Sequence, residues 1–304
     1  MRIVIAGGSG FLGQALTTYL SAGGHEIIVL GRGAGSASSQ SQVRAVHWTP
    51  DGKSGRWADA VDGADAIVNL AGAGIADRRW TAARKQLLLD SRVNSTRSLI
   101  AALRAARAKP AVFVQQSAVG FYGSFDNGPD CDERSAPGTD FLARICVAWE
   151  AEAQPAAGSG SRLVVLRTGI VLSHSGGALK RMLLPFRLFV GGRIGSGRQV
   201  MSWIHLDDWV GMTVWAITNP AVSGPLNVTA PNPVPNAEMA RAIGRAVHRP
   251  SVFPVPGIVM KTVFGEMATD TLLRGQRVLP RRATELGFQF LYPTIDQAMP
   301  AALS

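Results

Sequence analysis

The sequence predicts an α/β fold, a doubly wound parallel sheet with a smaller C-terminal lobe. Short apolar runs rich in β-branched residues, the first at residues 2–6, alternate with longer segments whose apolar residues recur at helical spacing. Such runs are typical of parallel strands that are buried on both faces. With 304 residues and 46% hydrophobic content, the chain is long enough to bury a large core.

A glycine-rich turn joins the first predicted strand to the first predicted helix. Gly7, Gly10 and Gly13 are spaced as in a dinucleotide-binding fingerprint. Gly7 permits the tight turn, Gly10 lets backbone N–H groups approach a pyrophosphate at the helix N-terminus, and Gly13 lets helix and strand pack closely. We therefore expect a dinucleotide to be bound by the consecutive residues Gly7, Gly8, Ser9, Gly10, Phe11, Leu12 and Gly13.

The end of the second predicted strand, residues 25–30, indicates NADP(H) as the cofactor. NAD sites carry an acidic residue here that binds the ribose 2′-hydroxyl, but Glu26, at the start of the strand, is the only acid within residues 14–50. Arg32 follows the strand instead, and its guanidinium suits a 2′-phosphate. A loop arginine without a ligand is the alternative. Residues 33–41, rich in Gly, Ser and Ala, predict a flexible loop.

The rest of the first 170 residues continues the alternation. Strands are predicted at 43–48, 65–70, 111–115 and 162–166, and helices at 81–108 and 141–157. Small residues follow the fourth strand, so Leu70, Ala71 and Gly72 are expected to lie against the cofactor. Ser117 follows the fifth strand, at the edge where such sheets bind ligands.

After residue 170 the alternation loosens. We predict a helix over 176–189, a strand at 202–205, a helix to 217 capped by Asp207, a strand at 226–229 and a helix over 237–247 capped by Asn236. The chain therefore divides into a dinucleotide-binding domain, residues 1–170, and a substrate lobe, residues 171–304. Residues 205–230 or so are expected to return to the main sheet.

Composition limits the partners that this chain can have. The net charge is +10, but the arginines are scattered, so specific nucleic-acid binding is not expected. Because no run of 18 apolar residues occurs and a strand begins at residue 2, we expect neither a membrane span nor a signal peptide. Cys131 and Cys146 make neither a disulfide framework nor a metal pattern, and two reduced thiols fit a cytoplasmic protein.

Motifs along nearly the whole chain resemble the extended and atypical short-chain dehydrogenases/reductases. Within that family the chain resembles the epimerase-like subfamily of sugar-nucleotide epimerase and cell-division-inhibitor homologues. Besides the glycine turn, the matching segments are Asn69-Leu70-Ala71-Gly72, Arg79-Trp80, Ser91-Arg92, Ser117-Ala118, Phe121-Tyr122-Gly123, Trp149-Glu150, Gly176-Gly177-Ala178-Leu179 and Ser202-Trp203-Ile204-His205. Phe264-Gly265-Glu266-Met267 and Gly287-Phe288 resemble that subfamily's C-terminal extension.

The chain departs from this family at the catalytic residues. The family uses Ser-Tyr-x-x-x-Lys, in which the Tyr is the general acid/base and its pKa is lowered by the Lys and by the nicotinamide charge. Ser117 matches the serine, but Leu142 and Cys146 stand near the Tyr and Lys positions. Met201 and Ile170 stand where the resemblance implies an Arg and an Asn that bind a sugar diphosphate.

Three residues are candidates for catalysis. Ser117 hydrogen-bonds either a ligand, such as the substrate or the nicotinamide amide, or only the backbone. Tyr122 is the only tyrosine near the expected nicotinamide end, which makes it a replacement acid/base, and a packed ring with a satisfied hydroxyl is the alternative. Asn94 resembles the family's helix asparagine, which supports the site through water or backbone. Glu133 and Glu150 are expected to be solvated.

Two functions of different classes follow from these residues. The first is an NADP(H)-binding epimerase- or oxidoreductase-like protein that acts on an unknown small molecule without the Tyr-x-x-x-Lys dyad. The second is an NADP(H)-binding regulatory or scaffold protein with little turnover, which the missing Tyr and Lys favour. Nucleic-acid binding rests on charge alone, no metal site is expected, and assembly as a homodimer is left open.

Overall fold

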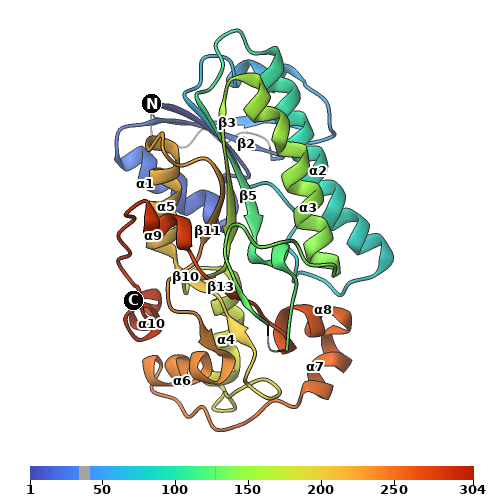
Figure 1. Cartoon of the computed structure of the whole chain (residues 1–304), viewed down its shortest axis with the longest axis vertical. Coiled ribbons are helices and arrows are strands. Elements are labelled where there is room, and N and C mark those ends of the chain that lie inside the picture. Colours follow the sequence, from blue (N-terminus) through green and yellow to red (C-terminus); the bar gives the residue numbers. More distant parts are fainter. Residues whose placement is uncertain (34–41, 127) are drawn as a thin grey trace.

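The computed structural model of the chain describes residues 1–33, 42–126 and 128–304. Its centre is a seven-stranded parallel sheet (Figure 1) with the strand order β11-β7-β5-β4-β1-β2-β3. The strands are β1 (Arg2–Ala6), β2 (Glu26–Gly31), β3 (Val43–His47), β4 (Ala66–Asn69), β5 (Val112–Ala118), β7 (Arg162–Thr168) and β11 (Gly224–Val228). The predicted doubly wound α/β fold is confirmed. Of the loop predicted at 33–41, residues 34–41 lie outside the described residues.

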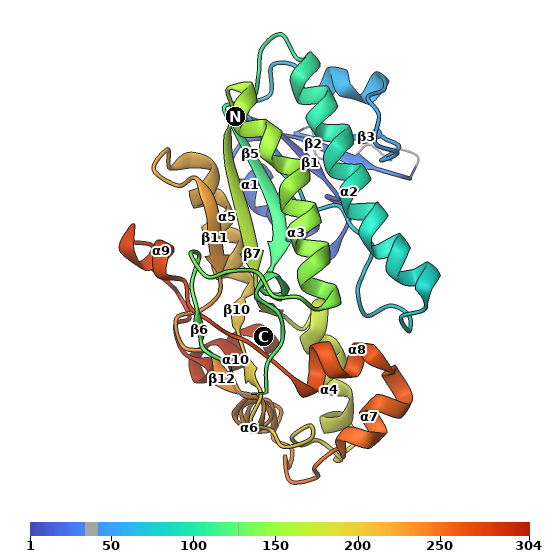
Figure 2. The ribbon, with the colours of Figure 1, turned by 45° about the vertical axis from the view of Figure 1, so that its right-hand side comes forward.

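Helices cover both faces of the sheet. One face carries α1 (Phe11–Ala22) and α5 (Leu206–Thr218), and the other carries α2 (Ala82–Ala105) beside α3 (Phe141–Ala153), as Figures 1 and 2 show. Alternate residues of β1 serve the two faces. Ile3 and Ile5 join the core with α1 and α5, whereas Val4 and Ala6 join the core with α2 and α3. The apolar run is continuous because both faces of the strand are buried.

The strand order reverses beside β1. This strand pairs with β2 on one side and with β4 on the other. In open α/β sheets, ligands bind at such a switch point, outside the carboxyl ends of the strands. The glycine turn after β1 and the small residues after β4 therefore lie at the edge where a ligand is expected.

The smaller lobe packs around a core of its own, with Leu179, Trp203, Met239 and Met299 among its buried residues. The helices after the main domain are α4 (Gly177–Arg187), α6 (Asn236–Ala246), α7 (Gly257–Phe264), α8 (Glu266–Ala268), α9 (Arg281–Glu285) and α10 (Ile295–Leu303). Short strand pairs are β8 (Ile170–Leu172) with β10 (Trp203–His205), β9 (Val200–Met201) with β12 (Val234–Pro235), and β6 (Asp130–Cys131) with β13 (Arg277–Val278).

The chain passes back from the lobe to the main sheet through α5 and β11. Trp209 and Met212 of α5 belong to the same core as Ile3 and Ile5 of β1, and β11 pairs with β7 at the sheet edge. The division of the chain into two units at residue 170 stays a prediction.

Two predicted helix caps are wrong. α5 is capped by His205, whose Nδ1 accepts a hydrogen bond from the N–H of Asp207 at 3.1 Å. α6 begins at Asn236 itself, and the Oδ1 of Asn236 accepts instead from the N–H of Ile194 at 2.7 Å. A polar residue able to cap stands near the start of each helix. At α6 the tertiary structure gives the side chain of Asn236 another partner, and at α5 the neighbouring residue His205 is the cap in place of Asp207.

Candidate functional site

The turn after β1 has the geometry that its glycines predict. Gly7 has a φ of +78°, a conformation that favours glycine, and its carbonyl accepts a hydrogen bond from the N–H of Gly10 at 3.0 Å. A Cβ on Gly13 would lie 2.4 Å from the carbonyl oxygen of Gly7. A Cβ on Gly8 would lie 2.8 Å from the side chain of Val29. Gly8 and Gly13 therefore serve the close packing of turn, helix and sheet.

The N-terminus of α1 opens onto this turn. Its N-cap residue, Gly10, is extended and has no side chain to cap the first turn. The backbone N–H groups of residues 11–13 consequently have no acceptor within the helix, and the helix dipole favours an anion in front of them. The side chains of these residues pack elsewhere, with Phe11 against Gly176 and Gly177 and Leu12 against the main core.

A cleft of about 250 Å³ runs along the C-terminal edge of the sheet beside this helix end. Its walls come from the ends of β1, β2, β3 and β4 and from α2, and consist of Gly7, Ser9, Gly10, Leu30, Gly31, Arg32, Trp48, Pro50, Leu70, Ala71, Gly72, Ala73, Leu87 and Ser91. The structure thus brings together most of the residues predicted to bind the cofactor. Gly8, Phe11, Leu12, Gly13 and Ser117 are not among these wall residues.

Four of the wall residues that were not predicted to bind the cofactor lie after β3 and on α2. Trp48 and Pro50 follow β3, and the N–H of Trp48 donates to the carbonyl of Gly31 at 3.0 Å. Leu87 and Ser91 lie about one turn apart on α2. The strand order, which places the end of β3 beside the end of β2, brings Trp48 and Pro50 to the cleft. The available signals are the aromatic residue Trp48 directly after a strand and Ser91 in the matching segment Ser91-Arg92.

Ser117, the penultimate residue of β5, belongs to a buried polar network. Its hydroxyl donates to Oε1 of Glu150 at 2.6 Å, and Arg167 donates to both oxygens of the same carboxylate at 3.0 and 2.8 Å. Arg167 also stacks on Phe121, with its Cζ 3.5 Å from the ring centroid. These four side chains are each less than a tenth exposed. The expectation that Glu150 is solvated is therefore wrong, because α3 directs its carboxylate to β5 and β7.

Tyr122 belongs to the same network, and its hydroxyl is engaged on both sides. It donates to Oδ1 of Asn227 at 2.7 Å and accepts from Arg167 at 3.0 Å. Burial raises the pKa of Tyr122 to about 12, although Arg167 opposes the shift. A general acid/base works best with a pKa near the working pH, so this geometry favours the packed ring, and the acid/base role of Tyr122 stays a prediction.

Glu133 is also held by the protein rather than by solvent. Its carboxylate accepts from the N–H of Asn227 at 3.0 Å and from the N–H of Arg282. Burial raises the pKa of Glu133 above its ordinary value, and these N–H groups oppose the shift. The carboxylate therefore ties the loop after β5 to β11 and α9.

Among the polar side chains that α2 buries is that of Arg92, whereas Asn94 is only partly buried. Asn94 is not a wall residue of the cleft, and its Oδ1 lies 3.5 Å from the position of a Cβ on Gly52, in the loop after β3. Arg92 is 7% exposed and donates to the carbonyls of Ala73 and Leu88 at 3.1 and 2.9 Å. Burial lowers the pKa of Arg92 to about 10. Arg92 thus holds the loop after β4, and the support role of Asn94 stays a prediction.

The positions of the missing Tyr and Lys lie on α3 beside the turn that follows β5. A Cβ on Gly120 would lie 3.3 Å from Cβ of Leu142 and 4.0 Å from Sγ of Cys146. Burial raises the pKa of Cys146 to about 11, so the thiol keeps its proton near neutral pH. Neither side chain supplies a group that exchanges protons there.

A second cavity continues from the ends of β5 and β7 into the lobe. It measures about 60 Å³, and its walls include Val119, Ile170, Met182, Gln199 and Met201. Val119 follows Ser117 by two residues, and Ile170 is the first residue of β8. The cavity therefore lies where the carboxyl ends of the central strands meet the lobe. This position makes it a candidate for a ligand that shares the sheet edge with a cofactor.

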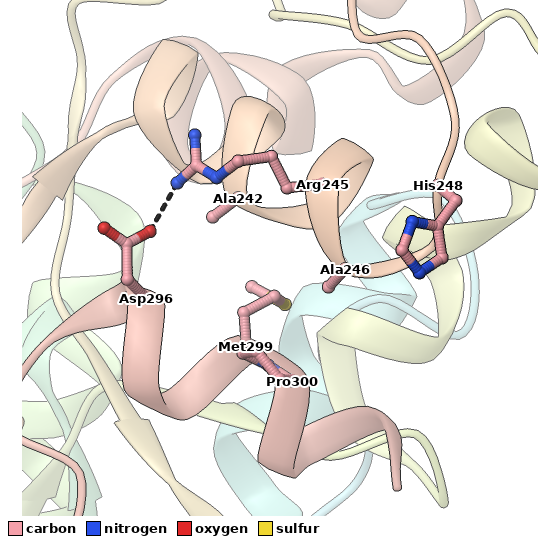
Figure 3. A pocket seen from close by; sticks show the side chains of 7 residues that line it. All are labelled: Ala242, Arg245, Ala246, His248, Asp296, Met299 and Pro300. Atoms are coloured by element: carbon pink, nitrogen blue, oxygen red, sulfur yellow. Dashed lines mark hydrogen bonds and ion pairs between the residues drawn. The ribbon is translucent and has the colours of Figure 1, made fainter.

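Another hollow lies on the surface of the lobe between α6 and α10 (Figure 3). Arg245 and Asp296 form an ion pair beside it, with His248 and Met299 also in its wall. Both ion-pair side chains are more than half exposed, and an exposed pair contributes little energy. The cavities at the sheet edge are therefore the better candidates.

The described residues contain neither a cluster of metal ligands nor a helix that could cross a membrane. Within residues 1–33, 42–126 and 128–304, no group of three or more His, Cys, Asp or Glu is placed to hold a metal ion. Among the helices of that described part, none combines the length and the hydropathy needed to cross a bilayer. Cys131 and Cys146 are both buried and unpaired there.

Known proteins resemble this chain along its full length. The sequence model of the NAD dependent epimerase/dehydratase family matches residues 3–229, and that of a domain of unknown function, DUF1731, matches residues 255–302. Epimerase family protein Mb2239 of Mycobacterium bovis is 45% identical over 298 residues, which cover 98% of this chain and 96% of that protein. Epimerase family protein YfhF of Bacillus subtilis is 38% identical over 299 residues, which cover 98% and 97%.

A solved structure is similar in both sequence and fold. The crystal structure of human epimerase family protein SDR39U1 (isoform 2) with NADPH is 37% identical and has a TM-score of 0.90. The match covers 99% of this chain and 99% of the human one. The predicted resemblance to the atypical epimerase-like subfamily with its C-terminal extension is confirmed.

Proposed function

Because the chain belongs to the NAD dependent epimerase/dehydratase family, we propose that it binds NADP(H) in the cleft and acts as an epimerase- or oxidoreductase-like protein on a small molecule. The observation that carries the proposal is the uncapped N-terminus of α1 beside a cleft that Arg32 lines. The similar human protein, crystallised with NADPH, supports the same cofactor.

The cleft residues fit a dinucleotide that carries an extra phosphate. The N–H groups of residues 11–13 would hold the pyrophosphate, at the close turn that Gly7 and Gly13 permit. Arg32 would hold the 2′-phosphate at the end of β2, with Trp48 on the adjoining strand end. None of the described residues in this wall is acidic, so no carboxylate there opposes the phosphate. The bound cofactor supplies hydride transfer at its nicotinamide.

A second candidate function is that of an NADP(H)-binding regulatory or scaffold protein with little turnover. It is supported by the buried hydroxyls of Ser117 and Tyr122 and by the high pKa of the Cys146 thiol, because positioned acid/base groups commonly contribute 10²–10⁴-fold to a rate. Incubating the cofactor-loaded protein with a metabolite extract while following nicotinamide fluorescence separates the two. Consumption of NADPH supports an oxidoreductase-like enzyme. Because an epimerase returns the hydride in each turnover, a constant signal supports the binder only when mass spectrometry also finds the metabolites of the extract unchanged.

The cofactor proposal is tested by titrating NADPH and NADH against the protein and against Arg32→Ala. Hydrogen bonds to charged groups contribute roughly 1.5–3 kcal/mol, so the substitution should weaken NADPH by about 10- to 150-fold. NADH lacks the 2′-phosphate and should bind almost unchanged. A protein that prefers NADH, or a substitution that weakens both cofactors equally, would show that Arg32 is not the selector.

Arg44→Ala is the matched control for this titration. Arg44 is an exposed arginine of β3 that is not among the wall residues of the cleft. Its loss removes the same charge from the same part of the molecule, so it isolates the general effect of charge from the effect of contact. We expect Arg44→Ala to change the affinity for NADPH by less than about twofold, in line with the screening of exposed charges.

The charge distribution and the cysteines support proposals on the substrate class and on the location. The arginines are scattered and do not form a dense basic patch, which favours a small-molecule substrate over specific nucleic-acid binding. The affinity of the protein for duplex DNA should be lost at moderate salt. Two buried, unpaired cysteines are consistent with a cytoplasmic location, which cell fractionation tests. Sedimentation velocity decides between a monomer and a homodimer.

A further inference from the structure

The walls of the cavity at β8 are mostly apolar, unlike those expected of a site that binds nucleotide sugars. Val119, Ile170, Met182 and Met201 give it apolar surfaces, and the two methionines can change rotamer to fit a ligand. Its volume of about 60 Å³ is well below the 150 Å³ or so of an engineered cavity that holds benzene. Only a small molecule, or the small end of a larger one, fits this space.

The cavity offers almost no charge to a ligand. Arg274 is its only charged wall residue within the described part of the chain. The side chain of Arg274 is 43% exposed, and its Nε lies 3.5 Å from Oδ2 of Asp126, so a carboxylate already accompanies it. A diphosphate or carboxylate that entered the cavity would lose its hydration without a buried cation to replace it, which is costly. The walls therefore select against anions.

One buried polar atom in the wall lacks a partner. Gln199 is 3% exposed, and its Nε2 donates to the carbonyls of Ile194 and Leu272 at 3.0 and 2.7 Å. These two bonds fix the orientation of the amide, since the oxygen cannot donate to a carbonyl. The Oε1 of Gln199 is left without a hydrogen-bond partner among the described residues. A buried acceptor of this kind costs free energy unless a donor reaches it.

Three other polar side chains around Gln199 are satisfied by the protein, whereas the half-buried amide of Gln276 makes no hydrogen bond to the described residues. The hydroxyl of Ser202 donates to the carbonyl of Gln276 and accepts from the N–H of Val278, each at 2.8 Å. The Oδ1 of Asn236 accepts from Ile194, as described above, and the hydroxyl of Thr271 donates to the carbonyl of Met267 at 2.7 Å. Among the buried side-chain atoms of this wall in the described residues, the Oε1 of Gln199 is thus the only one without a partner.

We propose that this cavity binds an uncharged small molecule, or the uncharged end of one, with an apolar body and a hydroxyl that donates to Oε1 of Gln199. The inference rests on the proposed NADP(H) function, because it assigns the substrate class for the same sheet edge. It excludes nucleotide sugars as ligands of this cavity, since their diphosphate would find Met201 where a cation is needed.

The test uses the full-length protein saturated with NADPH and labelled with ¹³C on the methionine methyl groups. Isobutanol is the probe, and isobutyrate is its anionic counterpart with the same carbon skeleton. Isobutanol should shift the signals of Met182 and Met201 in a saturable way, whereas isobutyrate and UDP-glucose should leave both in place. Stronger shifts with isobutyrate or UDP-glucose, or no shift with isobutanol, would overturn the proposal.

Two variants examine the hydrogen bond and the charge separately. Gln199→Met should weaken isobutanol by about 5- to 150-fold, the range for a donor left unpaired in an apolar site. Gln154→Met, on the surface of the main domain and outside this wall, removes an exposed amide, and it should change the affinity less than twofold. An unchanged affinity in a folded Gln199→Met protein argues against the assignment.

Met201→Arg supplies the missing cation and keeps the proposal testable if Gln199→Met fails to fold. This variant should gain saturable isobutyrate binding, read from the remaining Met182 signal, and should lose affinity for isobutanol. If Met201→Arg gains no anion binding, the selection against anions does not come from the walls. NADPH affinity is measured in each sample, so a failure of the cofactor proposal is seen independently of the probe.

Discussion

The ion pair between Glu150 and Arg167 is buried on both sides. Their side chains are 9% and 5% exposed. The charges are compensated by two hydrogen bonds between them, by the hydroxyl of Ser117, and by the ring of Phe121 under the guanidinium. Such a pair contributes little net stability over an apolar replacement, but removing one partner strands the other charge in a medium of low polarity.

Glu150→Gln should therefore destabilise the protein strongly. The substitution keeps the size of the side chain but leaves Arg167 without a counter-charge, and about 3–5 kcal/mol of the free energy of unfolding should be lost. The matched control is Glu152→Gln, which breaks the pair with Arg97, where the side chains are 28% and 52% exposed, and should cost less than about 1 kcal/mol. Urea unfolding of the three proteins measures both losses, and equal losses would contradict the assignment.

His205 should make the stability depend on pH. Burial lowers the pKa of His205 below its ordinary value, although Asp207 and Asp208 oppose the shift. Below about pH 6.5, the ordinary histidine pKa, the unfolded chain binds a proton that the folded chain does not bind. The free energy of unfolding therefore falls as the pH drops from about 6.5 toward the folded pKa of His205. The ring of Tyr292, 4.1 Å away between centroids, closes this environment.

The measurement compares the free energy of unfolding at pH 7.5 and pH 5.5 in wild type and in His205→Asn. Asparagine is a good N-cap and preserves the acceptor for α5, but it does not titrate in this range. The wild type should lose more stability than the variant between the two pH values. Glu133, whose pKa is raised by burial, acts in the opposite sense in both proteins and cancels in the comparison. The pKa of Asp208 is also raised by burial, but His205 opposes that shift, so the change in Asp208 is part of the effect of the substitution. An identical pH dependence would show that His205 does not titrate differently on folding.

Residue roles were only partly predictable from the sequence because they depend on which face of an element is buried. Arg92 lies four residues after Leu88 and seven before Leu99, so helical spacing places it on the buried face of α2. A motif comparison alone draws attention to Asn94 instead. Glu150 and Tyr122 could not be assigned from spacing, since their partners lie on β7 and β11, which only the folded sheet brings together.

At the scale of elements, the glycine turn is the feature on which sequence and structure agree most fully. Gly7 and Gly13 are each required by a contact with backbone, which no side-chain rearrangement can relieve. The apolar strands were equally predictable, because a strand that is buried on both faces shows a continuous apolar run. The helix caps were not, since His205 and Asp207 both stand at the start of α5 and tertiary contacts choose between them.

Gly13→Ala should damage both stability and cofactor binding. The added Cβ would lie 2.4 Å from the carbonyl oxygen of Gly7 and 2.5 Å from Cα of Gly8, so the helix must move away from the turn. Overpacking of this kind typically costs about 1–3 kcal/mol, and the displaced N–H groups should hold NADPH less tightly. Gly158→Ala, whose Cβ would meet no atom within 4 Å, is the control and should change stability by about 0.5 kcal/mol or less. Urea unfolding and NADPH titration on the two variants test this, and equal behaviour would remove the packing argument.

At the scale of the whole molecule, the chain does not divide as simply as its motifs suggest. The predicted boundary at residue 170 follows the end of β7, where the alternation of strands and helices loosens. The structure returns α5 and β11 to the first unit from beyond that point. The matched range of the epimerase family, residues 3–229, ends just after β11. The sequence indicated such a return at residues 205–230, but not that α5 shares one face of the sheet with α1.

A fragment of residues 1–170 should consequently fail to fold. It lacks α5, whose Trp209, Met212 and Ala216 lie fully buried against the face of the sheet that carries Ile3 and Ile5, and it leaves the edge of β7 without β11. An exposed apolar face together with an open strand edge favours aggregation. The fragment should show no cooperative urea transition and should bind a hydrophobic dye, whereas the full chain unfolds cooperatively. A fragment of residues 1–229 restores all seven strands and α5 and should recover a cooperative transition at a lower midpoint than the full chain. If residues 1–170 unfold cooperatively on their own, with a denaturant dependence that matches their size, the boundary at residue 170 separates two units and α5 is not needed to complete the first.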